Sequence, residues 1–156
     1  MPTVRPMTTA DVPACVAILN DIIARGGSTA YEDPYTEADF AAHYLQEAPV
    51  RMTALDGDRV VGFQAAFDHG DRLYSIGTFA DRRDPVPGTG RALFAATLAA
   101  CRARGGDAIL ARITSDNTGG LAFYSRMGFR DVDVIPGDVV RRSGTAVDRI
   151  VKRYDL

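Results

Sequence analysis

Two glycines in the middle of the chain have the spacing of an anion-binding turn. Gly88 and Gly90 stand between a pair of prolines and an alanine-rich segment that starts at Arg91. The start of a helix carries unpaired N–H groups and the positive end of the helix dipole. Glycine there lets a phosphate approach the backbone without a Cβ in the way. The pattern predicts a cradle for an anion, most simply a pyrophosphate; the alternative is a glycine-bearing turn that binds no ligand.

A strand and a helix must position this turn. Residues 73–79 are rich in the aromatic and β-branched types that favour a partly buried strand. The prolines that follow lack a backbone N–H and end regular pairing. From Arg91 the apolar residues recur at helical spacing until a Gly-Gly pair stops them. The unit therefore presents the turn at the amino end of a helix of residues 91–104.

The length and composition are those of one ordinary globular domain. The 156 residues are 46% hydrophobic and 24% charged, with a net charge of −2. That balance gives no basic excess for binding nucleic acid or an anionic membrane. No secretory signal or membrane-spanning run is seen, so we expect a cytoplasmic protein. Cys15 and Cys101 lack a metal-type spacing and fit buried free thiols, so we expect no metal site.

The first third of the chain predicts a short strand and two capped helices. Residues 4–6 form the strand. Thr8 occupies an N-cap position with Asp11 in the capping-box position, and an apolar face follows at helical spacing. Thr36 caps the second helix. Residues 28–34, between the two helices, are predicted to be a loop.

The rest of the chain alternates predicted strands with turns and two helices. Residues 68–71 form the turn before the central strand, and residues 136–144 form a polar loop before the last one. The second of the two helices is short and ends at Gly128, a natural left-handed cap. The predicted order is one strand, two helices, three strands, a helix, a strand, a helix and two strands. The strands after the first cover residues 50–55, 59–67, 73–79, 108–114, 129–135 and 145–154.

This order, with an anion-type loop after the fourth strand, resembles the GCN5-related N-acetyltransferase (GNAT) family over essentially the whole chain. The family's pyrophosphate loop is Gln/Arg-x-x-Gly-x-Gly/Ala, and residues 85–90 here are Pro-Val-Pro-Gly-Thr-Gly. Asn117, Phe123-Tyr124 and Gly128-Phe129 are similar to the family's Asn…Tyr…Gly-Phe pattern. The opening Val-Arg-Pro…Thr-x-x-Asp and the loop of residues 29–34 look like the phosphinothricin acetyltransferase-like branch.

The resemblance implies an α/β (α+β) fold in a single acetyltransferase domain, residues 1–156. Its central sheet would be mixed, mostly antiparallel, with about seven strands flanked by helices. The fourth and fifth strands would splay apart, and the pantetheine arm of acetyl-CoA would fill the gap. The family often forms dimers, so a homodimer is also expected.

The resemblance also implies roles for individual residues. Main-chain groups at Phe79 and Ala80 would pair with the pantetheine arm as a strand does. Asn117 would hydrogen-bond the same arm, the alternative being a plain N-cap. Tyr124 would face the sulfur and protonate the leaving thiolate as general acid, the alternative being a packing aromatic. The pyrophosphate would be received by backbone N–H groups of Val86, Gly88, Thr89, Gly90 and Arg91.

Two departures from the family pattern bear on activity. Pro85 stands where the family has Gln or Arg, and Pro85 and Pro87 remove two N–H groups from the loop. A glutamate general base that is often found in the branch's fourth strand has no counterpart, because Ser75 is at about the aligned position. Ser75 therefore occupies the catalytic position. Deprotonation of the amine is then left to water, or to Glu32 or Asp33 of the loop.

The acceptor is open beyond a small amine. Tyr31 and Glu32 are candidates to line its pocket, the alternative being a plain polar loop. Arg72, at the start of the central strand, is a candidate partner for a substrate carboxylate, the alternative being a solvated charge. His43 and His69 have no partners at catalytic or metal spacing, and we interpret both as structural or surface residues.

We therefore expect an acetyl-CoA-dependent N-acetyltransferase acting on the primary amine of a small molecule, an amino acid or an analogue. Transfer would be direct, in a ternary complex, because neither cysteine lies in the predicted site. The alternative is a weak or inactive acyl-CoA-binding or regulatory domain on the same fold. A Rossmann or P-loop nucleotide binder is disfavoured, because the loop lacks a third glycine and the chain has no Gly-Lys-Ser/Thr. We expect neither a nucleic acid nor a membrane as a partner.

Overall fold

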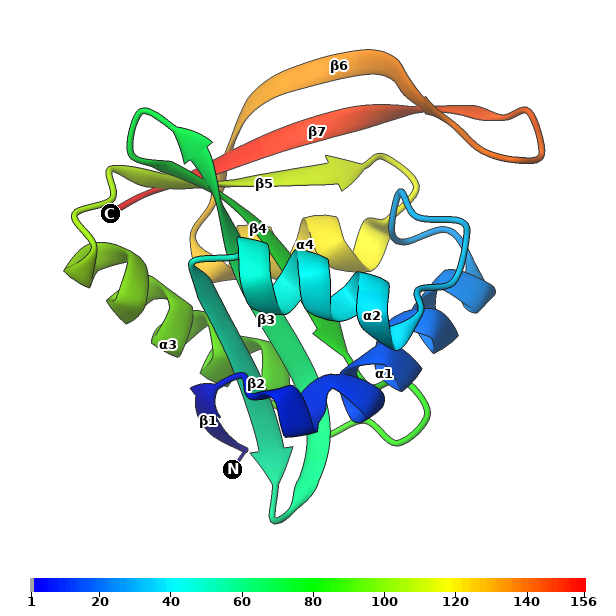
Figure 1. The fold of residues 1–156 in the computed structure, drawn as a ribbon. Coiled ribbons are helices and arrows are strands. Elements are labelled where there is room, and N and C mark those ends of the chain that lie inside the picture. The colour runs from blue at the N-terminus through cyan, green and yellow to red at the C-terminus, as the bar shows by residue number, and fades with distance from the viewer. Residues whose placement is uncertain (1) are drawn as a thin grey trace.

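A seven-stranded mixed sheet runs through the computed structural model, which describes residues 2–156 (Figure 1). The strands lie in the order β1–β2–β3–β4–β5–β7–β6, and neighbours are antiparallel except for β4 and β5. The predicted fold class and order of elements are confirmed. The strands are β1 (Thr3–Pro6), β2 (Val50–Asp56), β3 (Arg59–Gly70), β4 (Leu73–Ala80), β5 (Ala108–Thr114), β6 (Arg130–Val140) and β7 (Ala146–Asp155).

Helices cover both faces of the sheet (Figure 1). On one face lie α1 (Val12–Arg25) and α2 (Glu37–Phe40), and a π-helical segment, Ala41–Glu47, continues α2. On the other face lie α3 (Thr89–Ala103) and α4 (Thr118–Met127). Within residues 2–156, no helix has the length and apolar character needed to cross a membrane.

The sheet separates two apolar cores. On the α1 face, Phe63 of β3 stacks on Phe79 of β4 with ring centroids 4.9 Å apart. On the opposite face, Phe94 of α3 packs against Phe129 at 5.4 Å, and Phe129 packs against Tyr124 of α4 at 5.1 Å. Successive strand side chains point to opposite faces. Both cores therefore hold β4 in place, and β4 forms one wall of the site described below.

The helix caps lie where the sequence predicts them. The Thr8 amide donates to Asp11 Oδ2 at 2.9 Å, and a 3-10 turn of residues 9–11 leads into α1. The Asp39 amide donates to Thr36 Oγ1 at 3.1 Å at the start of α2. Gly128 ends α4 with φ 104°, a left-handed conformation that favours glycine. These local signals set the helix starts and stops without help from the rest of the chain.

Two predicted turns are wrong in their bounds. β3 continues to Gly70, and the turn consists of Asp71 and Arg72, both with positive φ (52° and 60°). The prediction failed because a register shift after Asp68 lets polar residues extend the hairpin beyond the core. Arg72 therefore lies in a turn and not in the central strand.

The predicted polar loop of residues 136–144 is mostly strand. β6 reaches Val140, and its pairing with β7 is interrupted between Ile135 and Val139. Pro136 is tolerated because β6 is an edge strand and the interruption needs no donor there. The extended β6–β7 hairpin reaches past the sheet towards the α1–α2 loop (Figure 1).

Candidate active site

β4 and β5 pair at one end only. Parallel pairing joins Leu73–Ile76 to Ala108–Ala111 and stops there. From Gly77 and Arg112 onward the strands separate, while β4 keeps its pairing with β3 as far as Ala80. The expected splay between the fourth and fifth strands is present. One edge of β4 is thereby left without a strand partner.

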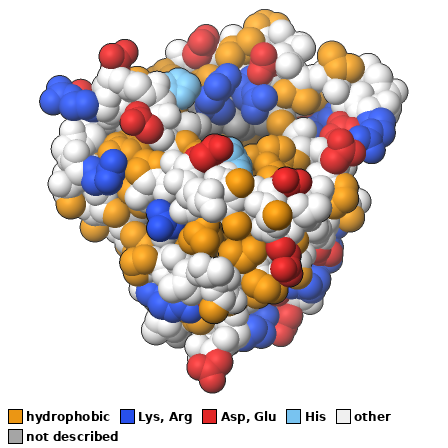
Figure 2. Space-filling view, viewed as in Figure 1, with side chains coloured by type: hydrophobic (Ala, Val, Ile, Leu, Met, Phe, Trp, Pro, Cys, Tyr) orange, Lys and Arg blue, Asp and Glu red, His pale blue; other side chains and the backbone are white. Residues whose placement is uncertain are grey.

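A cavity of about 890 Å³ occupies this separation, a volume typical of small-molecule sites. The ends of β4 and β5 that have separated from each other, the start of α3 and helix α4 form its walls. The α1–α2 loop and the π-helical segment close it on the α1 face. Figure 2 shows this face hollowed below a group of Lys and Arg side chains.

The amino end of α3 borders the cavity. Gly88 is its N-cap and has φ 84°, which requires glycine. Val86 O accepts from both the amide and the hydroxyl of Thr89, at 3.3 and 2.7 Å, so Thr89 is buried and holds the turn. Within residues 2–156, the amides of Gly88, Gly90 and Arg91 have no acceptor. The Val86 amide also has no acceptor within residues 2–156, so four of the five predicted donors are available to an anion and that of Thr89 is used internally.

Gly90 is needed for a reason that the sequence did not indicate. A Cβ at this position would lie 2.6 Å from Cε1 of Phe123. The amino end of α3 therefore meets the middle of α4 through a glycine and an aromatic ring. The contact places the start of α3 and the body of α4 on one wall of the cavity.

Tyr124 is buried on that wall, and its hydroxyl lies 2.8 Å from Thr78 Oγ1 on β4. Gln64 Nε2 of β3 donates to the same Thr78 oxygen at 2.9 Å. Burial raises the pKa of Tyr124 to about 12, although the Thr78 hydrogen bond opposes this rise. The phenol is therefore protonated at neutral pH. We did not single out Gln64 or Thr78 from the sequence; a lone amide inside the apolar run VVGFQAAF was the available signal.

Asn117 caps α4, since its Oδ1 accepts from the Gly120 amide at 2.9 Å. The capping interpretation is thus confirmed, and Asn117 also lines the cavity. Phe79 and Ala80 line it along the free edge of β4. Ser75 lines it too, half-buried, and its hydroxyl has no partner within residues 2–156.

The structure separates the predicted acceptor residues. Tyr31 lines the cavity. Glu32 instead accepts from the Arg142 amide at 3.0 and 2.9 Å, and Asp33 accepts from Arg142 Nη2 at 2.6 Å. Arg72 is exposed in its turn, with an ion pair to Asp107 at 3.1 Å, and does not reach the cavity.

Besides Arg91, four arginines that we did not assign to an acceptor line the cavity. No sequence motif marks these arginines, because each comes from a different segment of the chain. Arg149 is paired with Asp138 at 3.0 Å, whereas the side chains of the other three make no ion pair within residues 2–156. The four are Arg82, Arg112, Arg126 and Arg149.

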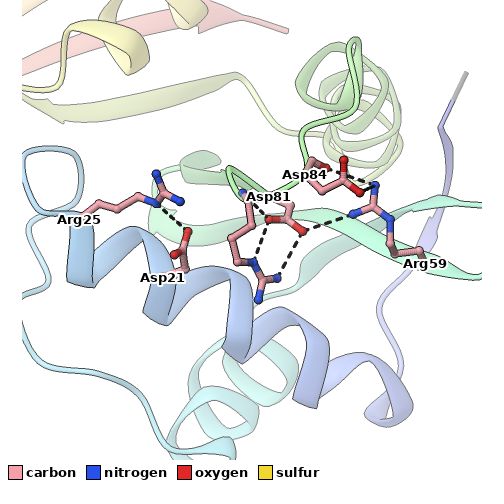
Figure 3. Close-up of polar contacts among 6 residues, drawn as sticks. Asp21, Arg25, Arg59, Asp81 and Asp84 are labelled. Carbon is pink, nitrogen blue, oxygen red and sulfur yellow. Dashed lines mark hydrogen bonds and ion pairs between the residues drawn. The ribbon is translucent and has the colours of Figure 1, made fainter.

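An ion cluster anchors the loop that carries the anion-binding turn (Figure 3). Asp81, buried at the end of β4, accepts from Arg83 Nε at 3.0 Å and from Arg59 Nη1 at 3.4 Å. Arg59 also reaches the Asp84 carbonyl at 3.2 Å. Burial opposes ionisation of Asp81, but hydrogen bonds from Arg83 and its charge outweigh burial and hold the carboxyl pKa below its usual range.

His43, which we interpreted as a structural or surface residue, has two polar neighbours. His43 Nδ1 lies 3.1 Å from Glu47 Oε2, and Nε2 lies 3.5 Å from the Tyr31 hydroxyl. The i,i+4 spacing of His43 and Glu47 was visible in the sequence, but Tyr31 comes from a different segment. His69 is exposed at the end of β3. Within residues 2–156, no three metal-ligating side chains are grouped to hold a metal ion.

Comparison with known proteins finds a matching family. The model of the acetyltransferase (GNAT) family matches residues 18–129. A search of curated proteins finds no match.

Several solved structures share the fold over nearly the whole chain. An N-acetyltransferase from Staphylococcus aureus Mu50 is 16% identical with TM-score 0.89, covering 99% of this chain and 98% of that one. A phosphinothricin acetyltransferase from Sinorhizobium meliloti, solved with AcCoA, is 21% identical with TM-score 0.89, covering 99% and 88%. A ribosomal-protein-alanine N-acetyltransferase from Brucella melitensis is 20% identical with TM-score 0.87, covering 98% and 99%. At identities this low the likeness shows the fold alone.

Proposed function

Because the chain belongs to the GNAT family of acetyltransferases, we propose that it moves the acetyl group of acetyl-CoA to the primary amine of a small molecule. Family membership supports acetyl transfer in general; the acceptor and the mechanism are the proposal. One observation carries it: a buried, protonated Tyr124 lines the cavity at the separation of β4 and β5. A general acid is needed there, because a leaving thiolate must gain a proton.

The residues of the cavity fit acetyl-CoA. The free amides of Gly88, Gly90 and Arg91 at the start of α3 suit a diphosphate, with Arg82 nearby on the wall. The open edge of β4 at Phe79 suits an amide-bearing arm. Asn117 would donate its NH₂ group to the same arm. When bound, the cofactor supplies an activated acetyl group as a thioester.

The chain's own residues would order the proton transfer. Gln64 donates to Thr78 Oγ1, which leaves the Thr78 hydrogen free to point at the Tyr124 oxygen. Tyr124 then directs its own hydrogen into the cavity, towards the leaving sulfur. Each hydroxyl has one hydrogen, so a Thr78 hydroxyl that donates to Tyr124 leaves the Tyr124 hydrogen for the cavity. The tyrosine is thus held in the orientation that a general acid needs.

Direct transfer in a ternary complex is supported by the state of the thiols. Cys15 and Cys101 are fully buried, and neither lines the cavity. Burial raises the pKa of Cys15 to about 12 and that of Cys101 to about 11. Both therefore remain protonated thiols, which are poor nucleophiles for a covalent acetyl intermediate.

The acceptor would enter from the α1 face, where Tyr31, Phe67 and Ser75 line the cavity. Arg112, where β5 separates from β4, suits a carboxylate on that acceptor, the role that we expected of Arg72. An amino acid or an analogue is therefore the proposed substrate class. We further propose that residues 1–156 form a single acetyltransferase domain and that two copies pair, since Val132 and Val134 of the edge strand are 46% and 49% exposed.

The missing glutamate and the two prolines favour a second candidate, a weak or inactive acyl-CoA-binding domain. An assay of CoA thiol release distinguishes the transferase from the acyl-CoA-binding domain. The released thiol is followed with a thiol reagent over a panel of amino acids and simple primary amines. Turnover with any amine supports the transferase. Calorimetric binding of acetyl-CoA without turnover would favour the second candidate. In either case Gly88→Asp should abolish binding, because it places a carboxylate at the diphosphate.

A further inference from the structure

Among the described residues that line the cavity, no carboxylate is free to act as the base that removes a proton from the acceptor amine. Of the described residues that line it, Asp81 is the only carboxylic acid, and it is paired with Arg83 and Arg59. Glu32 and Asp33 are taken up by Arg142 outside this lining. An ammonium must lose a proton before its nitrogen can attack. Another element of the structure must supply the acceptor for that proton.

Tyr31 lines the cavity, and its hydroxyl lies next to the imidazole of His43. Its hydroxyl lies 3.5 Å from His43 Nε2, while His43 Nδ1 lies 3.1 Å from Glu47 Oε2. The Tyr44 hydroxyl donates to the Tyr31 oxygen at 3.1 Å. Hydrogen bonds of this kind are often long before substrate binds and tighten in the complex.

The partners determine where each hydrogen lies. An ionised Glu47 can only accept, so His43 Nδ1 carries the hydrogen and Nε2 of the neutral ring is left as an acceptor. Tyr31 already accepts from Tyr44, so its own hydrogen is free to point at Nε2. The order carboxylate, imidazole, hydroxyl is the one in which a carboxylate orients a histidine to take a proton from a hydroxyl.

The surroundings hold this arrangement in place. His43, Tyr44 and Glu47 lie on the π-helical segment, a distortion that occurs frequently at functional sites. The His43 ring stacks on Phe67 of β3, with centroids 4.5 Å apart. The titratable groups that face the ring are Glu47 and Tyr44 from its own segment and Tyr31 and Tyr35 from the α1–α2 loop. Burial raises the pKa of Tyr44 and Tyr35, so both remain neutral.

We propose that Tyr31, His43 and Glu47 form a proton relay that deprotonates the acceptor amine; the relay rests on the proposed function. The amine N–H bond breaks, and its proton passes to the Tyr31 oxygen. The Tyr31 hydrogen passes to His43 Nε2 in the same step. Glu47 stabilises the imidazolium, which later releases the proton to water. Tyr31 is the catalytic residue, and His43 and Glu47 act through it.

Kinetics with an amine that the wild type acetylates test the relay. His43→Gln should lower kcat by about 100-fold at pH 7, the scale of general base catalysis. It should also remove the acid limb of the pH–rate profile, because that limb reports protonation of the base. Imidazole added to His43→Ala should restore part of the rate. His69→Gln, which removes the other histidine, should behave as wild type.

A double-variant cycle separates a relay from simple packing. Tyr31→Phe should lower kcat about as much as His43→Gln does. The combined variant should lower kcat no further than either single variant, because breaking one link of a relay already stops the proton transfer. Additive losses with an unchanged pH profile would overturn the relay. Glu47→Gln should give an intermediate loss, about tenfold, because water can reach this 66% exposed carboxylate.

Nitrogen NMR of the two histidines tests the geometry without substrate. The His69→Gln protein leaves a single imidazole, and its neutral form should carry hydrogen on Nδ1. Hydrogen on Nε2 would overturn the relay even if the protein turns over. No CoA release from wild type with any amine of the panel would overturn the proposed function, and the relay with it. Turnover with an unaltered His43→Gln profile would overturn the relay alone.

Discussion

At the scale of residues, the site depends on two short hydrogen-bonded chains on opposite faces of β4. Gln64, Thr78 and Tyr124 form one, and Tyr31, His43 and Glu47 form the other. The first would deliver a proton to the leaving sulfur, and the second would remove one from the amine. Acid and base are thus held apart by a strand and cannot neutralise each other directly.

The first chain gives a prediction for Thr78→Val. The variant removes the hydroxyl that orients Tyr124, so kcat should fall by about tenfold, less than the loss for Tyr124→Phe. The Kd of acetyl-CoA, measured by calorimetry, should stay nearly unchanged. Thr97→Val is the matched control, because the Thr97 hydroxyl is buried without a partner among residues 2–156 and its loss should not lower activity. Equal kcat for Thr78→Val and wild type would contradict the orienting role.

These two sets of hydrogen-bonded residues also show which parts of a site can be predicted from a sequence. Tyr124 and Asn117 belong to a motif with fixed spacing, so their positions beside the cavity could be expected. Gln64 and Thr78 meet only because β3 and β4 pair in one register. Tyr31 and His43 meet only through folding of the loop onto the π-helical segment. Contacts between separate segments leave no spacing in the chain, and that is why His43 was interpreted as structural.

At the scale of elements, the contact between α3 and α4 sets the wall that carries the turn at Gly88 and Tyr124. The sequence predicted both helices and the caps of α4, because caps are local, but α3 begins at Thr89 and not at the predicted Arg91. It did not predict that Gly90 is the point where the helices touch. It also misplaced two hairpin turns, since register shifts in β3 and β6 depend on partner strands.

Gly90→Ala should therefore destabilise the protein despite the better helix propensity of alanine. The added Cβ would lie 2.6 Å from Cε1 of Phe123, so the Phe123 ring or the two helices must shift. We expect a lower Tm in thermal unfolding and weaker binding of acetyl-CoA. Gly119→Ala on α4 is the control, because nothing lies within 4 Å of its added Cβ, and its Tm should be unchanged or higher. A Tm for Gly90→Ala at or above that of wild type would refute the contact.

A second element-scale prediction concerns Arg141 in the β6–β7 turn. This half-buried guanidinium donates to Asp116 at 2.8 and 3.0 Å and to the Thr29 carbonyl, so it ties the hairpin to the α1–α2 loop. Arg141→Gln should loosen the loop that carries Tyr31. The KM of the amine should rise severalfold, with the Kd of acetyl-CoA unchanged, in steady-state kinetics and calorimetry. Arg153→Gln, which breaks a partly exposed pair, should change neither.

At the scale of the whole molecule, partly or fully buried carboxylates link folding to pH. Hydrogen bonds from Arg5 lower the pKa of Asp11, and those from Arg141 lower the pKa of Asp116. In Asp81, contacts with Arg83 outweigh the opposing effect of burial. All three folded-state values lie below the unfolded value. Their stabilisation is therefore complete above the unfolded pKa and is lost as pH falls through the folded pKa.

We expect Tm to be nearly flat from pH 7 to about pH 5 and to fall steeply below about pH 4, where carboxylates begin to bind protons in the unfolded chain. Circular dichroism melts across this range measure the effect. Asp81→Asn should lower Tm at pH 7 and make the fall shallower. A Tm that rises on acidification would contradict the linkage.

If acetyl-CoA binds between β4 and β5 as proposed, the stability of the fold depends on the concentration of this cofactor, because the two strands pair only in part. Among residues 2–156, β4 and β5 pair only from Leu73 to Ile76 and from Ala108 to Ala111. A ligand that binds along the open edge of β4 would therefore act as an added strand between the two halves of the sheet. A ligand that binds only the folded chain adds about 2.7 kcal/mol at 100 times its Kd. The folded protein would thus be more stable in a cell with a high concentration of the acyl donor than in one with a low concentration.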